Sequence, residues 1–318
     1  IKNAIAVNSG TSAIYLALKC LDLKKGDEVI TTPMSWLVSS TAIKIAGGKP
    51  IFADVDENFN LDPKSVIKKI SKKTKVILVV HFYGKIAQIK KLKEIARKKN
   101  LLLIEDSAQA FGAKTSGKYA GTFGDIGTYS FSPMKVFGSF GNAGAVVFKN
   151  KKYLKKLKSL RTLGTVNREI CETAELKFDI DPLHAAHISE NFNVFEKLKR
   201  KRIDLAKRYH KNLSGHFSNL PKINKEYDHT FYDYTILVND RSKVIKYLYK
   251  HGIEVKVRHP LLINQQPVFK KLKKTKLNKA NNFVKKILSL PMHYNLTHSE
   301  IDYVCKKLIE FKKNQIKI

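Results

Sequence analysis

The first half of the chain alternates short apolar runs with longer stretches of helical periodicity. The apolar runs are rich in β-branched residues and have the length of strands; they cover residues 29–31, 51–54, 76–80, 101–105, 125–131 and 145–148. Between them, apolar residues recur at helical spacing over 11–21, 64–70 and 86–100. This alternation predicts an α/β fold in which helices cover both faces of a mostly parallel sheet.

The second half of the chain predicts a smaller α/β unit. Residues 151–161 form a helical pattern with leucines on one face and lysines on the other, and a longer helical pattern covers 183–213. Shorter strand-like and helical patterns follow at 232–238, 243–251, 253–257 and 301–311. We therefore predict two domains, a large one over residues 1–200 and a small C-terminal one over 201–318.

The charge of the chain is strongly positive and at first suggests a nucleic-acid-binding protein. The formal net charge is +33, but it comes from 52 lysines and only 8 arginines, spread over the whole length. Arginine, with its planar fork of donors, is the residue that base and phosphate recognition favours. A basic nucleic-acid-binding protein stays an alternative, although no helix-turn-helix, zinc or RRM signature supports it. We expect no specific nucleic-acid partner.

Other classes of protein are disfavoured by the sequence. No apolar run reaches the roughly 18–20 residues that span a bilayer, so we expect no membrane insertion. The chain starts at Ile1 without a signal-peptide pattern, and we expect that its natural N-terminal segment is missing. Cys20, Cys171 and Cys305 lie far apart in no metal or redox spacing, which predicts reduced thiols, a cytoplasmic protein and no metal site.

A small polar turn follows the first apolar run, residues 4–7. It reads Asn-Ser-Gly-Thr-Ser-Ala over residues 8–13 and leads into a helical pattern. The free N–H groups and hydroxyls of such a turn suit a phosphate group, although an ordinary Ser/Thr helix cap would look the same.

Two further strand ends carry chemically useful side chains. Glu105 and Asp106 end the apolar run 101–105; either they cap the following turn, or one carboxylate holds a proton on the ring nitrogen of a cofactor. Lys135 follows the strand pattern 125–131 in a Gly-rich turn with small and apolar neighbours. Desolvation there lowers the pKa of a lysine and makes the amine a nucleophile for a carbonyl. A phosphate turn, a strand-end Asp and a sequestered Lys are what pyridoxal 5′-phosphate (PLP) needs.

These motifs also carry a family resemblance. The chain resembles the DegT/DnrJ/EryC1/StrS aminotransferases, which are PLP enzymes of fold type I acting on nucleotide-linked keto sugars. The resemblance rests on seven runs in the same order: NSGTSAIYLAL, GDEVITTP, KPIFADVD, VVHFYG, LIEDSAQAFGA, GDIGTYSFSPMK and GNAGAVVF. It runs from about residue 4 to 311 and includes, towards the C-terminus, the runs HGIEVKVRHPLL, QPVF and LSLPMHYNLT.

The resemblance implies a role for each matching residue. Lys135 would carry the cofactor covalently and move a proton between the substrate carbon and the cofactor, and Asp106 would pair with the pyridinium nitrogen. Gln109 would lie against the 3′-oxygen, and Trp36 would stack on the pyridine face. The phosphate would be held by Gly10, Thr11, Ser12 and Ser130.

The chain departs from the family pattern in three places. The family often has a Tyr-Asn-Tyr-Arg-like run that reaches the phosphate of the neighbouring subunit, whereas this chain reads Leu-Lys-Phe-Asp over 176–179. Lys177 could make that contact as a point charge. The family's frequent Arg-x-His-Gly appears as Arg-Thr-Leu-Gly over 161–164, and the segment before Ile1 that helps line the substrate cleft is absent. The resemblance further implies a homodimer with shared active sites.

The sequence thus predicts a cytoplasmic aminotransferase that converts a nucleotide-linked keto-deoxy-sugar to an amino sugar for polysaccharide, glycan or glycoside synthesis. The resemblance implies L-glutamate as donor and specifies neither the sugar, the nucleotide nor C3 against C4 amination. A PLP-dependent sugar dehydratase is one alternative, but that branch of the family has His in place of the lysine. An inactive member is another, and the presence of Asp106, Gln109 and Lys135 disfavours it.

Overall fold

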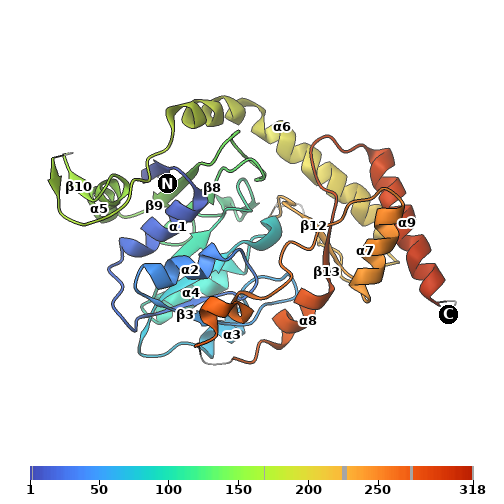
Figure 1. The fold of residues 1–318 in the computed structure, drawn as a ribbon, viewed down its shortest axis with the longest axis horizontal. Helices are drawn as coiled ribbons and strands as arrows, with labels where there is room; N and C mark the ends of the chain where they lie inside the picture. Colours follow the sequence, from blue (N-terminus) through green and yellow to red (C-terminus); the bar gives the residue numbers. More distant parts are fainter. Residues whose placement is uncertain (2, 168, 224–227, 273–274, 317–318) are drawn as a thin grey trace.

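The computed structural model describes residues 1, 3–167, 169–223, 228–272 and 275–316 and has an α/β architecture (Figure 1). A seven-stranded sheet with the order β1-β9-β8-β5-β4-β2-β3 forms its centre. These strands are β1 (Asn3–Val7), β2 (Glu28–Thr31), β3 (Lys49–Phe52), β4 (Thr74–Val80), β5 (Leu102–Asp106), β8 (Ile126–Ser130) and β9 (Gly144–Phe148). The pairings from β3 to β8 are parallel and the two pairings of β9 are antiparallel, which confirms the predicted mostly parallel sheet.

Both faces of the sheet are buried, as the apolar runs predicted. Along β4, Val76 and Leu78 face one apolar cluster, whereas Ile77 and Val79 face another. The first cluster is completed by α1 (Gly10–Lys19), α2 (Val38–Ile45) and α5 (Lys152–Arg161), and the second by α3 (Pro63–Ile67) and α4 (Ile89–Lys98). A strand covered on both sides by helices reads as a continuous apolar run, because neither face meets water.

The C-terminal part of the chain contributes a separate apolar cluster. The helix α6 (Pro182–Leu213) runs from the sheet to this part, where it packs on α9 (His298–Ile316; Figure 1). The cluster also contains residues of β12 (Tyr234–Leu237), α7 (Arg241–Lys250), β13 (Ile287–Leu290) and α9 (His298–Ile316). The first residue of this C-terminal cluster is Ile203. The later helix α8 (Asn278–Lys286) does not join it and packs instead on the large apolar cluster of the central sheet. The domain boundary at residue 200 stays a prediction.

Several short elements differ from the predicted pattern. The predicted strand 253–257 forms only an isolated bridge, between Lys256 and Ser289 of β13. The pattern did not predict α2, α8, β13, the 3₁₀ turns at Phe82–Gly84, Ile263–Gln265 and Pro267–Phe269, or two small hairpins. The hairpins are β6 (Lys114–Thr115) with β7 (Lys118–Tyr119), and β10 (Thr165–Val166) with β11 (Ile170–Cys171).

Three structural findings bear on the classes that the sequence disfavours. Among the described residues, no helix combines the length and the apolar character needed to cross a membrane. Cys20 and Cys305 are buried, whereas Cys171 is exposed, and all three are free thiols. Within the described ranges, no cluster of His, Cys, Asp and Glu side chains is arranged to hold a metal ion.

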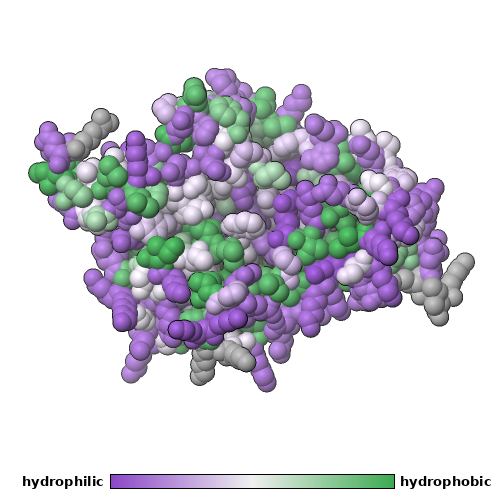
Figure 2. All heavy atoms as spheres, in the orientation of Figure 1, coloured by the Kyte–Doolittle hydropathy of each residue, from purple (hydrophilic) through white to green (hydrophobic). Residues whose placement is uncertain are grey.

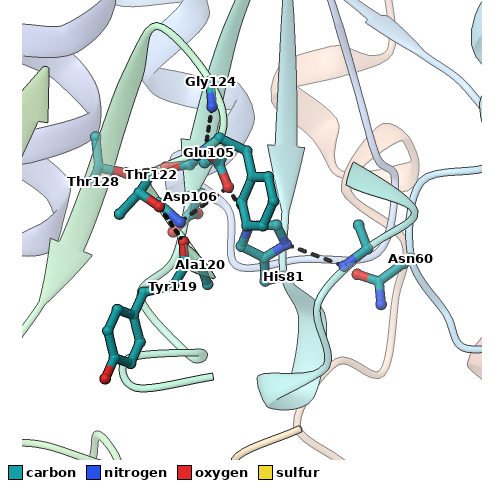
Figure 3. A network of polar contacts seen from close by, with 12 residues as sticks. Asn60, His81, Glu105, Asp106, Tyr119, Ala120, Thr122, Gly124 and Thr128 are labelled. Atoms are coloured by element: carbon teal, nitrogen blue, oxygen red, sulfur yellow. Dashed lines mark hydrogen bonds and ion pairs between the residues drawn. The ribbon is translucent and has the colours of Figure 1, made fainter. Parts of the chain in front are cut away.

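A wholly buried carboxylate fixes the end of β5. Glu105 accepts hydrogen bonds from the backbone N–H groups of Gly121 (3.0 Å), Phe123 (2.7 Å) and Gly124 (2.5 Å). Its fourth bond joins Oε2 to His81 Nε2 at 2.9 Å (Figure 3). Because His81 Nδ1 accepts from the N–H of Ala87, the imidazole carries its proton on Nε2 and is neutral. Four donors therefore stabilise one buried anion.

The substitution Glu105→Gln tests the importance of this anion for stability. The new amide NH₂ cannot accept from the turn 121–124, so buried N–H groups lose their acceptor. We expect the free energy of unfolding to fall by about 3 kcal/mol in urea denaturation. The matched control is Glu94→Gln, which removes an exposed carboxylate from α4 and should change stability by less than about 0.5 kcal/mol. Equal effects of the two changes would contradict this account.

Candidate active site

One cavity brings together most of the residues that the sequence singled out. Its volume is about 630 Å³, and it opens where β5 and β8 end, against the segment 255–259. Seven of the nine predicted site residues line it: Gly10, Thr11, Trp36, Asp106, Gln109, Ser130 and Lys135. Ser12 and Lys177 do not. The carboxyl ends of parallel strands are where ligands bind in sheets of this type.

The N-terminus of α1 forms one wall of the cavity. Ser9 caps the helix by accepting from the N–H of Ser12 at 3.1 Å, and the buried Ser12 hydroxyl donates to Asn8 Oδ1 at 2.6 Å. Ser12 therefore stabilises the turn rather than facing the cavity. No acceptor among the described residues pairs with the N–H groups of Gly10 and Thr11. With no acidic residue in the first turn, this helix end suits an anion.

The close approach of α1 to β8 requires a glycine. A Cβ added to Gly10 would lie 2.5 Å from the Cβ of Ser130, well inside van der Waals contact. The missing side chain lets the helix N-terminus and the Ser130 hydroxyl line the same corner of the cavity. This corner has the donors and the space that a phosphate group needs.

Asp106 presents a buried carboxylate to the cavity. It is 4% exposed, and it accepts from the hydroxyl of Ser39 and from the N–H of Ala108, both at 3.1 Å. Burial raises the pKa of Asp106, while these bonds and the nearby Lys135 oppose that rise. Because Glu105 and Asp106 are consecutive on one strand, their side chains lie on opposite faces of the sheet. Of the two, only Asp106 lines the cavity.

Lys135 lies in a largely desolvated setting. Its Nζ lies over the ring of Tyr232, 5.0 Å from the ring centre. Burial lowers the pKa of Lys135, Asp106 and Asp233 oppose that effect, and the cation of Arg258 adds to it. The lowered pKa favours the neutral amine, which is the nucleophilic form.

Gln109 and Trp36 lie at the margin of the cavity. Gln109 Oε1 accepts from the N–H of Tyr83 at 2.6 Å, which leaves its amide NH₂ as the group able to donate to a ligand. Trp36 is 61% exposed and meets His259 edge-on at 5.9 Å between ring centres. Its exposed ring is free to cover a planar ligand.

Lys177 lies in a different part of the surface. It forms an isolated bridge with Thr162 and lines a groove beside α5 together with Arg161 and Asp179. Its carbonyl accepts from Asn8 Nδ2 at 3.5 Å, so the segment passes next to the α1 turn but not through the cavity. The contact of Lys177 with a neighbouring subunit stays a prediction.

The structure adds cavity residues that the motifs did not single out. Arg258 Nε donates to the buried Asp233 at 2.5 Å, and its guanidinium lies 5.0 Å from the centre of the Tyr232 ring. Next to it, His259 is buried; burial first, then Arg258 and Lys135, lower its pKa to about 4, so the imidazole is neutral. Both residues lie in the run HGIEVKVRHPLL, which belongs to the family resemblance, but the resemblance assigned neither of them a role.

The arrangement fits the chemistry of PLP. The free N–H groups of Gly10 and Thr11 suit its phosphate, the buried carboxylate of Asp106 suits its ring nitrogen, and the amine of Lys135 suits its aldehyde.

Comparison with known proteins agrees with this fit. The profile of the DegT/DnrJ/EryC1/StrS aminotransferase family matches residues 1–309. A pleiotropic regulatory protein of Geobacillus stearothermophilus is 34% identical over 98% of this chain and 86% of its own length. A UDP-N-acetyl-3-dehydro-alpha-D-glucosamine 3-aminotransferase of Acidithiobacillus ferrooxidans is 32% identical over 95% and 82%. The crystal structure of NtdA from Bacillus subtilis with bound cofactor PMP superposes with a TM-score of 0.89, at 31% identity over 98% of this chain and 74% of that one. The chain belongs to the DegT/DnrJ/EryC1/StrS aminotransferase family.

Proposed function

We propose that this enzyme uses PLP to transfer an amino group from L-glutamate to the keto group of a nucleotide-linked sugar. The observation that supports it most strongly is the single cavity in which a helix N-terminus, a buried carboxylate and a desolvated lysine meet. The sugar-nucleotide aminotransferase among its relatives supports the substrate class. The protein would act in the cytoplasm, on amino sugars for polysaccharide or glycan synthesis.

Each wall of the cavity would hold one part of the cofactor. The N–H groups of Gly10 and Thr11 and the Ser130 hydroxyl would bind the phosphate. Asp106 would accept a hydrogen bond from the protonated ring nitrogen, and Trp36 would cover the ring. When bound, PLP supplies an electrophilic carbon and an electron sink that stabilises negative charge at the substrate carbon.

The protein groups would bind the reactants and move the proton. The neutral amine of Lys135 would hold the cofactor in the resting enzyme and, once released, would take a proton from the donor carbon and return one to the sugar carbon. The Ser39 hydroxyl holds Asp106 in place, so the carboxylate needs little reorganisation to meet the ring. Buried aromatic and apolar side chains such as Tyr232 and Val80 exclude water from this end of the cavity.

The protein would work as a homodimer. Exposed apolar side chains gather on the projection formed by α5 and the β10–β11 hairpin, including Leu163, Ile170 and Leu176 (Figure 2). A patch of this kind favours burial against another protein surface. Lys177 lies at the base of the same projection, so a second subunit could receive it at the phosphate. We further propose that residues 1–200 and 201–318 are the two domains between which the cavity is closed.

The spectrum of the cofactor tests the role of Lys135. Enzyme loaded with PLP should absorb visible light through its covalent link to Lys135, and L-glutamate should move the absorption to that of the amine form of the cofactor. Lys135→Ala should abolish the linked spectrum and lower turnover at least a thousandfold, because both the attachment point and the proton carrier are lost. Lys98→Ala, which changes an exposed lysine on α4, is the control. An unaltered spectrum in Lys135→Ala would refute this assignment.

The pH dependence of cofactor attachment tests the electrostatics of the cavity. Since burial lowers the pKa of Lys135, attachment to the cofactor-free enzyme should reach half its maximal rate below pH 10.5, the ordinary lysine value. The Asp106 carboxylate holds that pKa up, so Asp106→Asn should move the midpoint to lower pH still. Ionisation of free PLP is common to both proteins and cancels in the comparison. A midpoint that rises in Asp106→Asn would contradict the proposed pairing.

Mixing two defective variants tests whether the sites are shared. If Lys177 serves the partner's site, Lys135→Ala and Lys177→Ala subunits should complement each other when they are unfolded and refolded together. A random mixture of dimers would regain about a quarter of wild-type activity, because half of the dimers are mixed and each has one intact site. Activity that equals the mean of the separate variants would exclude a role for Lys177 across the interface.

A further inference from the structure

Arg258 lies at the junction of two cavities. Besides the cavity that contains Lys135, a second one of about 600 Å³ adjoins it, and Met134, Lys256 and Arg258 line both. The second cavity extends along the C-terminal cluster, past Leu290 and Leu296 to Tyr303. A molecule that reaches from Lys135 into the second cavity therefore passes Arg258.

The guanidinium of Arg258 is held in place but is not saturated. Nε donates to Asp233, whose carboxylate is 1% exposed and also accepts from the hydroxyl of Ser289 at 3.3 Å. In the described part of the chain, neither Nη1 nor Nη2 of Arg258 has an acceptor. Arg202 makes the contrast clear, because both of its Nη groups donate to backbone carbonyls of the fold.

The other cations of the cavity are less suited to bind an anion. Lys135 is the reacting amine, and Lys256 is half exposed and paired with Glu254 at 3.4 Å. Arg258 and Lys135 each lie 5.0 Å from the centre of the same Tyr232 ring, so the two cations are at most about 10 Å apart. An anionic group on a substrate bound at Lys135 is thus within reach of the two free Nη groups.

We propose that Arg258 is the shared anion-recognition residue of both half-reactions: its Nη1 and Nη2 bind a carboxylate of the amino-acid donor and then the diphosphate of the sugar nucleotide. This inference rests on the proposed function and extends it to a specific residue. Donor and acceptor occupy one cavity in turn, and each brings an anionic group. A planar pair of N–H donors matches both a carboxylate and a phosphate.

The position between the cavities explains how one residue serves two ligands. In a sugar nucleotide the diphosphate separates the sugar from the nucleoside, as Arg258 separates the cavity of Lys135 from the second cavity. A sugar at Lys135 then places the diphosphate at Arg258 and the nucleoside beyond it, where Tyr303 offers an aromatic face. The amino-acid donor is shorter, so its carboxylate reaches Arg258 from within the cavity of Lys135 and the donor does not enter the second cavity.

Two titrations on PLP-loaded enzyme test the proposal. L-Glutamate is titrated against the cofactor absorbance, and UDP, dTDP and GDP are titrated by calorimetry as probes of the diphosphate site. Arg258→Gln should raise the half-saturating glutamate concentration and the Kd of the best-bound nucleotide, each by about tenfold to a hundredfold. The limiting rate at saturating glutamate should change far less, because the chemistry at Lys135 keeps its groups. The control Arg208→Gln removes another Arg–Asp pair, at the surface beside Asp302, and should change neither constant.

The loss of Arg258 leaves Asp233 as a buried charge without its cation, so the single variant can be unstable. The double variant Asp233→Asn/Arg258→Gln removes both charges and keeps a pair of amides in their place. In this double variant too, the half-saturating glutamate concentration and the Kd of the nucleotide should both rise.

The outcomes separate this inference from the proposed function. If wild-type enzyme responds to glutamate and binds a nucleotide, but the Arg258 variants weaken neither ligand or only one, the shared role is wrong. If the wild-type cofactor spectrum does not respond to glutamate and no nucleotide binds, the proposed function itself fails, and the inference falls with it. Weakening of both ligands in both variants supports the shared role.

Discussion

The ionised carboxylate of Glu105 is the constraint on which the active site depends. It lies wholly in the interior, and a buried charge is tolerated only when hydrogen bonds replace its hydration. Its four donors come from the turn 121–124 and from His81, so one side chain ties β4, β5 and the approach to β8 together (Figure 3). The next residue on the strand is Asp106, which faces the cavity. The hydrogen bonds of Glu105 on one face of the sheet thus hold the strand end that presents Asp106 to the cavity on the other face.

The cavity balances its charges in two neighbouring pairs. Asp106 faces Lys135, and Asp233 binds Arg258, with the Tyr232 ring in contact with both cations. A second unbalanced cation beside Lys135 would lower the pKa of its amine further, and Asp233 limits that effect. The enzyme can therefore keep a permanent positive group for anionic substrates next to an amine that must be neutral to react.

The sequence predicted the parts of the structure that local patterns determine. The apolar runs located the buried strands, and the turn at Gly10, Asp106 and Lys135 lie at one cavity as their strand-end positions indicated. It could not reveal the Arg258–Asp233 pair, which joins residues 25 positions apart. It also missed α2, because its β-branched sequence Val-Ser-Ser-Thr-Ala-Ile-Lys-Ile favours strand, and packing of Ala42 and Ile43 on the large cluster overrides that preference. The sequence could not tell which serine hydroxyl of the turn caps the helix and which faces the cavity, so it placed Ser12 wrongly. The predicted contact of Lys177 lies in a neighbouring subunit, so one chain cannot test it.

The lysines of this chain serve two different purposes: the exposed ones give the protein its large positive charge, and the buried Lys135 is the reactive amine. Exposed lysines such as Lys98 and Lys243 are more than half accessible and are screened by salt, so each adds little to the potential at a distance. Their sum still favours anionic ligands near the surface and raises the rate of encounter with a sugar nucleotide. Selection of the ligand needs fixed geometry, which long solvated side chains do not provide. The geometry comes instead from buried partners, Asp233 for Arg258 and Asp106 for Lys135. These few held cations select among the anionic ligands that the many exposed lysines attract.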